Sequence, residues 1–208
     1  MTFPRTDGID IDSSVNALIE NTTLDCGDDC FTLKSGRGEE AVDLGRPTQN
    51  IVIRNCRVKR GVGGITVGTE TAGFIRNVYA ENVVMEEPRM PLYFKTRRPR
   101  GGGAENIWIR NVKVSKANGP AIQMDMLGSP SWMGALAERL PAQPVGKVTP
   151  RFSDIHVDDF TVGECRLLIQ AKGLPEMPVE NMTVTNVKSK NKNIRLQDVG
   201  TIEITFAE

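Results

Sequence analysis

The chain has 208 residues, which is long enough for one domain with a sizeable hydrophobic core. Its 26 Lys and Arg residues balance 26 Asp and Glu residues, so the formal net charge is zero. This balance argues against a nucleic acid or an anionic membrane as the main partner, and no apolar run approaches the ~20 residues that span a membrane.

A six-residue pattern recurs along the chain and predicts a solenoid. Each copy has Asn or Asp, apolar residues at the first and third following positions, and Asn or Asp again at the fifth. The alternation within a copy indicates a strand, and its return every few dozen residues indicates stacked coils. Asn can stack its amide from coil to coil and tolerates a left-handed corner. The copies begin at Asn16, Asn50, Asn77, Asn106, Asp154 and Asn181.

Each coil also contains a further alternating strand whose apolar pairs would face inward. Aligned, these pairs are Ile9/Ile11, Phe31/Leu33, Ile65/Val67, Leu92/Phe94, Ile122/Met124 and Leu167/Ile169. The sequence therefore predicts an all-β fold, a right-handed parallel β-helix of about six coils in which residues 1–208 form one domain. The high glycine content and the 5% of aromatic residues also favour strands and turns over a helical bundle.

Two segments interrupt the repeat. Residues 35–49 are expected to form a polar loop between coils, and the Pro-rich residues 126–150 a longer insertion with a short helix within 131–140. Such an insertion either walls a binding groove or is an idle surface loop.

The four cysteines show no metal-binding spacing, and we expect small buried side chains, with disulfide pairing left open. They are Cys26, Cys30, Cys56 and Cys165. We expect no metal and no cofactor.

Three aspartates are the candidate catalytic groups. Asp7 and Asp28 lie 21 positions apart, about one coil, so Asp7, Asp28 and Asp29 would meet on one outer face. Adjacent strand residues point to opposite faces, so Gly27 is expected to mark a bend that lets both Asp28 and Asp29 reach the groove. Paired carboxylates split glycosidic bonds, and an inverting pair is separated by roughly 6.5–9.5 Å to admit a water.

Several motifs in order resemble the polygalacturonase family of pectin hydrolases, glycoside hydrolase family 28, over residues 4–125. The motifs are Thr6-Asp7-Gly8-Ile9-Asp10, Gly27-Asp28-Asp29-Cys30, Lys34-Ser35-Gly36-Arg37, Arg60-Gly61-Val62-Gly63-Gly64-Ile65 with Gly68-Thr69-Glu70, and Tyr93-Phe94-Lys95-Thr96 with Arg100-Gly101-Gly102.

The resemblance implies a parallel β-helix that hydrolyses galacturonic-acid linkages with inversion, in polygalacturonate or rhamnogalacturonan. It makes Asp28 the general acid, Asp7 and Asp29 the pair that activates water, and Lys95 the group that binds a substrate carboxylate. Tyr93 and Arg100 are further substrate-binding candidates, although a solvated loop is an equal interpretation of Arg100. We expect a monomeric, secreted or periplasmic protein whose partner is a pectic polysaccharide or oligogalacturonide, although no signal peptide is visible in this chain.

The sequence departs from the family pattern at several positions. Arg5 stands where Asn is usual, Val62 stands where a histidine is usual, and Tyr93 replaces a basic residue. The one histidine, His156, is expected on the surface of a late coil. Because family members have further coils before the Thr-Asp-Gly motif, we expect this chain to be the C-terminal part of a longer β-helix.

Two alternatives to hydrolysis stay open. A catalytically impaired fragment would still bind uronates through Lys95, and Val62 favours this interpretation. A calcium-dependent β-helical lyase ranks last, because the sequence shows no dense outward carboxylate cluster with a nearby catalytic arginine.

Overall fold

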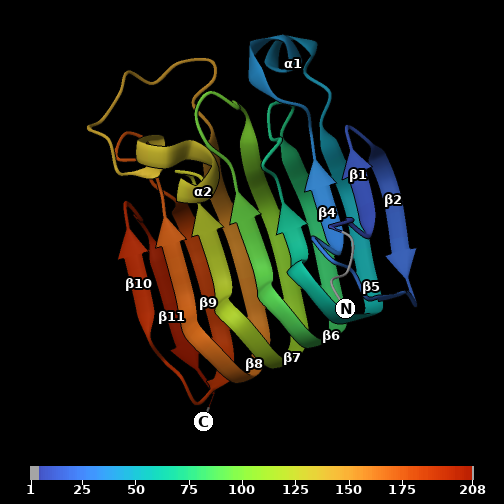
Figure 1. Cartoon of the computed structure of the whole chain (residues 1–208). Coiled ribbons are helices and arrows are strands. Elements are labelled where there is room, and N and C mark those ends of the chain that lie inside the picture. Colours follow the sequence, from blue (N-terminus) through green and yellow to red (C-terminus); the bar gives the residue numbers. More distant parts are fainter. Residues whose placement is uncertain (1–4, 208) are drawn as a thin grey trace.

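Alternating apolar residues wind the chain into a right-handed parallel β-helix (Figure 1). The structure is a computed structural model and describes residues 5–207. Its strands pair in parallel in the order β1-β4-β5-β6-β7-β8-β9-β11, with β2 and β3 on β5 and β10 on β8. The strands are β1 Ile9–Asp12, β2 Val15–Glu20, β3 Thr23–Leu24, β4 Phe31–Lys34, β5 Thr48–Val67, β6 Ile75–Lys95, β7 Gly103–Asp125, β8 Arg151–Lys172, β9 Glu180–Ser189, β10 Ile194–Gln197 and β11 Ile202–Phe206.

The repeated Asn and Asp residues form the corners of the coils, as predicted. Every residue that opens or closes a copy of the pattern has a positive φ, between 48° and 60°. Their side chains also form ladders along the axis: Asn106 donates from Nδ2 to Asn77 Oδ1 at 2.8 Å, and Asn77 donates to Asn50 at 3.1 Å. Asn tolerates this left-handed conformation better than other non-glycine residues, so one residue type both turns the chain and links neighbouring coils.

The strand that carries the candidate site stacks in the predicted register through most of the fold. Ile9 pairs with Phe31, Phe31 with Ile65, and Ile65 with Leu92, and this column continues to Ile122. The side chains of these rungs face an interior that contains fully buried Phe31, Phe94, Phe152 and Phe160.

The predicted register of the last coil is wrong. Ile122 pairs with Ile169 rather than Leu167, and Leu168, which was expected to point outward, is fully buried. The pairing of β7 with β8 shifts between Ala117 and Pro120, where β7 has one residue more than β8. Strand β10 adds a further rung beyond those aligned from the sequence.

The two segments that interrupt the repeat, residues 35–49 and 126–150, both contain helices (Figure 1). The polar loop expected over residues 35–49 contains helix α1, Gly38–Leu44, which has two glutamates in its first turn and ends at the left-handed Gly45. Acidic residues at a helix start and glycine at its end stabilise the helix, so the expectation of a loop was wrong. The insertion at 126–150 contains helix α2, Pro130–Met133, and the 3₁₀ helix η1, Gly134–Ala137, within the range predicted for a short helix.

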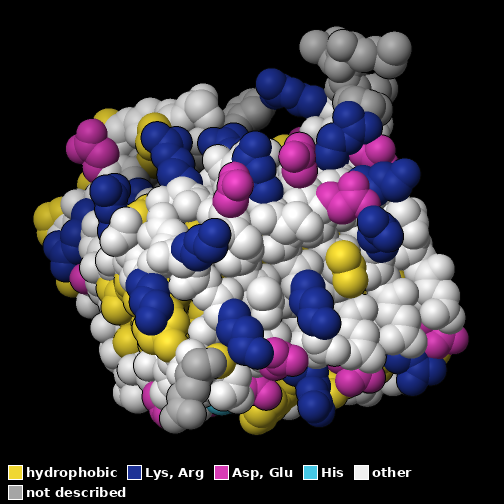
Figure 2. All heavy atoms as spheres, turned by 90° about the horizontal axis from the view of Figure 1, so that it is seen from below, with side chains coloured by type: hydrophobic (Ala, Val, Ile, Leu, Met, Phe, Trp, Pro, Cys, Tyr) yellow, Lys and Arg dark blue, Asp and Glu magenta, His cyan; other side chains and the backbone are white. Residues whose placement is uncertain are grey.

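The four cysteines are free thiols, with Cys30 and Cys56 buried in the core. Among residues 5–207 no helix has the length and apolar character needed to cross a bilayer. Figure 2 shows Lys and Arg side chains scattered over the face seen from below, with acidic side chains among them.

Candidate active site

Asp7, Asp28 and Asp29 meet on the outer face of the first two coils. One carboxylate oxygen from each lies within 4.8 Å of the others. Asp7 precedes β1 and Asp29 precedes β4, and the amide of Gly8 donates to the Asp29 carbonyl at 2.8 Å. Gly27 and Asp28 form a bend outside the strands, as predicted, which allows both adjacent carboxylates to reach the cluster. The nearest oxygens are closer than the roughly 6.5–9.5 Å expected for an inverting pair and can share one water.

Lys34 holds Asp7 from the neighbouring coil. Its ammonium lies 3.1 Å from Asp7 Oδ2 and 2.6 Å from Asp10 Oδ2, and so bridges two carboxylates of the first coil. Burial alone would lower the pKa of the Lys34 ammonium, but hydrogen bonds to Asp10 and Asp7 outweigh it and raise the pKa. Lys34 therefore stays charged and fixes the position of Asp7.

Lys95 holds Asp29 in the same way. Its Nζ donates to Asp29 Oδ2 at 2.7 Å and lies 4.8 Å from the centre of the Tyr93 ring. Asp29 is only 2% exposed, and its Oδ1 has no hydrogen-bond partner among the described residues. Burial, followed by the charges of Asp125 and Asp29, raises the pKa of the Tyr93 phenol, so Tyr93 presents a neutral hydroxyl. The structure thus brings Lys95 and Tyr93 together with the acidic cluster.

Asp28 differs from both neighbours because no ion pair to it is found among residues 5–207. Burial and then the negative charges of Asp29 and Asp7 raise the pKa of the Asp28 carboxyl, which Lys95 offsets only in part. A raised pKa favours the protonated form that a general acid needs. The cluster therefore contains two lysine-paired carboxylates and one unpaired carboxyl.

Gly63 allows the third coil to approach the cluster closely. A Cβ atom at Gly63 would lie 1.9 Å from Thr66 Oγ1 and 2.7 Å from Asp29 Oδ1, so no larger residue fits without displacing them. Thr66 Oγ1 and Thr32 Oγ1 are also buried without a partner among the described residues. Buried polar atoms of this kind commonly bind water.

Other sequence candidates lie in different surroundings. Arg100 faces Glu70, with its nitrogen 3.4 Å from the carboxylate, and its predicted contact with substrate stays a prediction. His156 stacks on Trp108 with ring centroids 4.1 Å apart, and its Nδ1 lies 2.9 Å from the Thr183 hydroxyl. Because these positions lie on the side of the coils that bears the asparagine ladder, His156 does not replace the imidazole missing at Val62.

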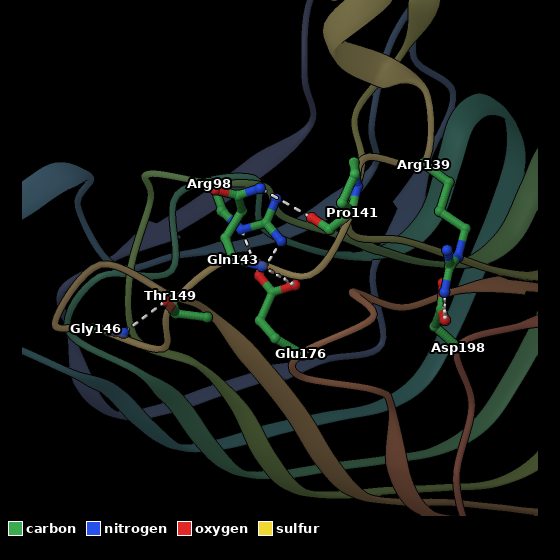
Figure 3. A network of polar contacts seen from close by, with 8 residues as sticks. All are labelled: Arg98, Arg139, Pro141, Gln143, Gly146, Thr149, Glu176 and Asp198. Carbon is green, nitrogen blue, oxygen red and sulfur yellow. Dashed lines mark hydrogen bonds and ion pairs between the residues drawn. The ribbon is translucent and has the colours of Figure 1, made fainter.

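The insertion at 126–150 is anchored to the later coils (Figure 3). The backbone amide of Gln143 in the insertion donates to the nearly buried Glu176, which also pairs with Arg98, and Arg139 binds Asp198 through two hydrogen bonds of 2.7 and 2.8 Å. The insertion also walls a cavity of about 220 Å³ lined mainly by apolar side chains, including Met126, Leu127 and Leu174. This insertion therefore has a fixed position beyond the Lys95 end of the site.

Sequence reasoning missed the role of Lys34 in the site and gave Asp125 a structural or substrate-binding part without a defined contact. Lys34 appeared in a motif without a role, although its alignment with Asp12 in the outward column indicated that it faces the groove. Asp125, which pairs in register with Lys95, accepts hydrogen bonds from the amides of Leu127 and Gly128, both at 3.0 Å. Its side chain therefore helps to hold the start of the insertion.

The same acidic cluster is the group of described carboxylates close enough together to hold a cation. Asp7 and Asp29, however, already face the ammonium groups of Lys34 and Lys95. These lysines supply the positive charge that a metal ion would otherwise bring, so the geometry favours acid–base chemistry over a metal centre.

Comparison with known proteins identifies similar chains. A family model described as glycosyl hydrolases family 28 matches residues 2–131. The chain is 28% identical over 186 residues to a probable polygalacturonase of Vitis vinifera, covering 88% of this chain and 36% of that protein. It is 30% identical over 156 residues to an exo-poly-alpha-D-galacturonosidase of Dickeya chrysanthemi, covering 75% of this chain and 25% of that protein.

A solved structure shares the fold. The hyperthermoactive exopolygalacturonase of Thermotoga maritima superposes with a TM-score of 0.77 at 24% identity, covering 98% of this chain and 45% of that chain. The chain therefore spans less than half the length of the two curated relatives and of this structure.

Proposed function

The chain belongs to glycosyl hydrolase family 28, and from that premise we propose that it hydrolyses galacturonic-acid linkages of pectin. The observation that carries the proposal is the asymmetry of the acidic cluster. Asp7 and Asp29 each face a lysine, whereas Asp28 has no such partner and its carboxyl pKa is raised. Glycoside hydrolysis needs this combination of one protonated and one ionised carboxyl.

Asp28 acts as the general acid in this proposal. Its proton passes to the glycosidic oxygen as the bond to the anomeric carbon breaks, so that the leaving sugar departs as an alcohol. The negative charges of Asp7 and Asp29 stabilise the positive charge that develops on the sugar ring. Asp28 is only partly buried, so the leaving oxygen can reach its carboxyl.

A water molecule held by Asp7 and Asp29 attacks the opposite side of the anomeric carbon. These carboxylates take the proton that the water loses, and the product has the inverted configuration. A retaining mechanism would require one carboxylate to reach the sugar and form a bond with it. Asp29 is 2% exposed and bound to Lys95, which makes it a poor nucleophile and favours water attack.

Lys95 and Tyr93 lie on β6, two rungs from β4, and suit a uronate substrate. The Lys95 ammonium can contact a substrate carboxylate while it remains close to Asp29, and the neutral Tyr93 hydroxyl can donate to a sugar oxygen. Arg100 is proposed as a more distant contact on the same side. A pectic polysaccharide is found in cell walls, so the proposed substrate also implies action outside the cytoplasm.

The test measures reducing ends released from polygalacturonate by the wild-type chain and by Asp28→Asn. We expect Asp28→Asn to lose at least about a hundredfold in kcat with little change in KM, because general acid catalysis supplies about that factor. Asp43→Asn, on the exposed face of α1, is the matched control and should keep full activity. Full activity of Asp28→Asn would overturn the assignment of the acid.

The stereochemistry of the first product separates hydrolytic routes. Proton NMR of a fresh digest should show the β-anomer at the new reducing end, whereas the α-anomer would indicate retention. Binding of oligogalacturonate without any turnover by the wild-type chain would instead support the non-catalytic alternative.

A further inference from the structure

One side of the β-helix carries more basic than acidic residues, although the whole chain has a formal net charge of zero. This side is formed by the strand segments that follow the second Asn or Asp of each repeat. Figure 2 shows it from below, with basic side chains across its middle. We define the basic face by the cations that β5, β7 and the end of β9 contribute to this side. They are Arg57, Lys59, Lys113, Lys116, Lys188 and Lys190.

The cations of the basic face recur on alternate coils. Arg57 of β5 pairs in register with Val84, and Val84 pairs with Lys113 of β7. Lys113 pairs with Thr161, and Thr161 pairs with Lys188 of β9. Because neighbouring strands are about 4.8 Å apart, the backbones of successive cations in this column are about 10 Å apart. The column is therefore a regular row of positive charges along the axis of the solenoid.

Most of these charges have no acidic partner. Every member of the basic face is exposed except Lys116, which is partly exposed. Arg57 binds Glu86 at 2.7 Å, but no ion pair to a lysine of the basic face is found among residues 5–207. Lys116 pairs in register with Glu164 without forming a salt bridge. The protein therefore leaves the lysine charges to the solvent and its ions.

The residues between the cations indicate which kind of polyanion fits. The described residues of this side include no exposed aromatic ring on which a nucleic-acid base could stack. Val84, which is 41% exposed, is the large hydrophobic residue exposed there, and it offers too little apolar surface to enter a bilayer. A polysaccharide with a carboxylate on each sugar needs neither feature, only cations spaced along an extended surface.

We propose that the basic face binds de-esterified pectin outside the acidic cluster and so anchors the polymer to the protein. This proposal rests on the proposed function, because it takes the substrate to be a polyuronate. The cluster of Asp7, Asp28 and Asp29 is itself negative, so it exerts little long-range attraction on a polyanion. Strand β5 contains both Arg57 and Gly63, so the basic face adjoins the site. Polymer that binds there has a raised local concentration at the cluster.

The basic face should distinguish long polymers from short oligomers. Lys188 belongs to β9, five strand spacings from β4, so about 24 Å separate the two strands along the axis. A trisaccharide bound at the acidic cluster does not reach this far end, whereas a long chain can contact both places. Fully methyl-esterified pectin lacks the carboxylates that the lysines would bind, so it should not bind to the basic face.

The experiment measures binding of long, de-esterified polygalacturonate to the full chain carrying Asp28→Asn, so that the polymer is not cut. Affinity electrophoresis, referred to gels without polymer, compares this protein with and without Lys113→Gln and Lys188→Gln together. We expect the double substitution to weaken binding about three- to tenfold at low salt. The slope of log affinity against log salt concentration should become shallower by about one to two. Trigalacturonate binding, measured by calorimetry, should stay the same.

The matched control is the pair Arg54→Gln and Arg110→Gln. These arginines lie two rungs apart on the side that bears the asparagine ladder, in register through Glu81, so the control removes the same charge at the same spacing. Equal weakening in both double variants would overturn the basic face as a binding surface, as would unchanged polymer affinity in the lysine variant. Tighter binding of single-stranded DNA or phosphatidylglycerol vesicles than of polygalacturonate would overturn pectin as the partner.

Activity on a short substrate separates this proposal from the proposed function. Release of reducing ends from trigalacturonate requires the acidic cluster but neither Lys113 nor Lys188. Release by the wild-type chain, combined with polymer binding that does not depend on these lysines, would overturn the basic face alone. An absence of release, combined with polymer binding that does depend on them, would overturn the hydrolase assignment and retain the basic face as a polyuronate-binding surface.

Discussion

Replacing Lys95 by Met should destabilise the fold as well as impair the site. Lys95 is the one ion-pair partner of Asp29 among residues 5–207, with Nζ 2.7 Å from Oδ2. The Asp29 side chain is 3% exposed, and its second oxygen already has no partner in the described structure. The Lys95→Met variant would therefore leave a buried carboxylate without compensation.

The expected cost is about 3 kcal/mol at pH 7, near the lower end for a broken buried pair, because 20% of the Lys95 side chain is exposed. Domains of this kind are stable by roughly 5–15 kcal/mol, so the change is large enough to measure. Urea denaturation followed by circular dichroism gives the free energy of unfolding of each variant.

A double-mutant cycle isolates the pair. Asp29→Asn removes the charge that Lys95→Met leaves unpaired, so the double variant should recover about 2 kcal/mol relative to the sum of the single losses. Lys147→Met is the control, because its pair with Asp43 is exposed and should contribute little to the stability of the fold. A cost below about 1 kcal/mol in Lys95→Met, unchanged by Asp29→Asn, would refute this reasoning.

Two further predictions concern Asp28 and Gly63. Because the pKa of the Asp28 carboxyl is raised in the folded state, its stabilising contribution is complete below its unfolded pKa and is lost as pH rises. Asp28→Asn should thus raise the midpoint of thermal unfolding at pH 7 by about 2–4 °C, which corresponds to a gain of about 1 kcal/mol in the free energy of unfolding. No gain is expected at about pH 3. A variant with the same midpoint as the wild type at pH 7 would contradict this prediction. Gly63→Ala should lower the free energy of unfolding by about 1–3 kcal/mol and remove most of the activity, because the added carbon would displace Thr66 and Asp29. Gly146→Ala is the control: no atom lies within 4 Å of the added carbon, so neither stability nor activity should change.

The corners and most of the register could be predicted because they depend on local properties. Asn and Asp tolerate the left-handed conformation, and strict alternation fixes which side chains face the core, so the copies beginning at Asn50 and Asn77 needed no knowledge of their neighbours. Helix α1 was missed although its signals were present, since two glutamates precede a glycine at the correct distance.

The remaining errors come from features that only stacked coils define. The extra residue of β7 between Ala117 and Pro120 shifts the pairing of the last rung. The apolar alternation within a single strand does not reveal that the neighbouring strand is one residue shorter. The contact of Lys34 with Asp7 and Asp10 depends on how far its side chain reaches from one coil to the next. Site residues were found through motifs, but their charge pairing required the structure.

In the proposed mechanism, that pairing lets a site with Val62 in place of an imidazole distinguish its acid from its bases. Asp7 faces an ammonium group from the next rung and Asp29 one from two rungs away, whereas the carboxyl of Asp28 is partly buried near two negative charges. Burial and neighbouring charges within the stacked coils therefore raise the pKa of the Asp28 carboxyl without a histidine at position 62. It follows that the alkaline limb of the pH–rate profile should report the ionisation of Asp28. Removing Lys34 or Lys95 should move this limb to higher pH, because it leaves an uncompensated negative charge beside Asp28.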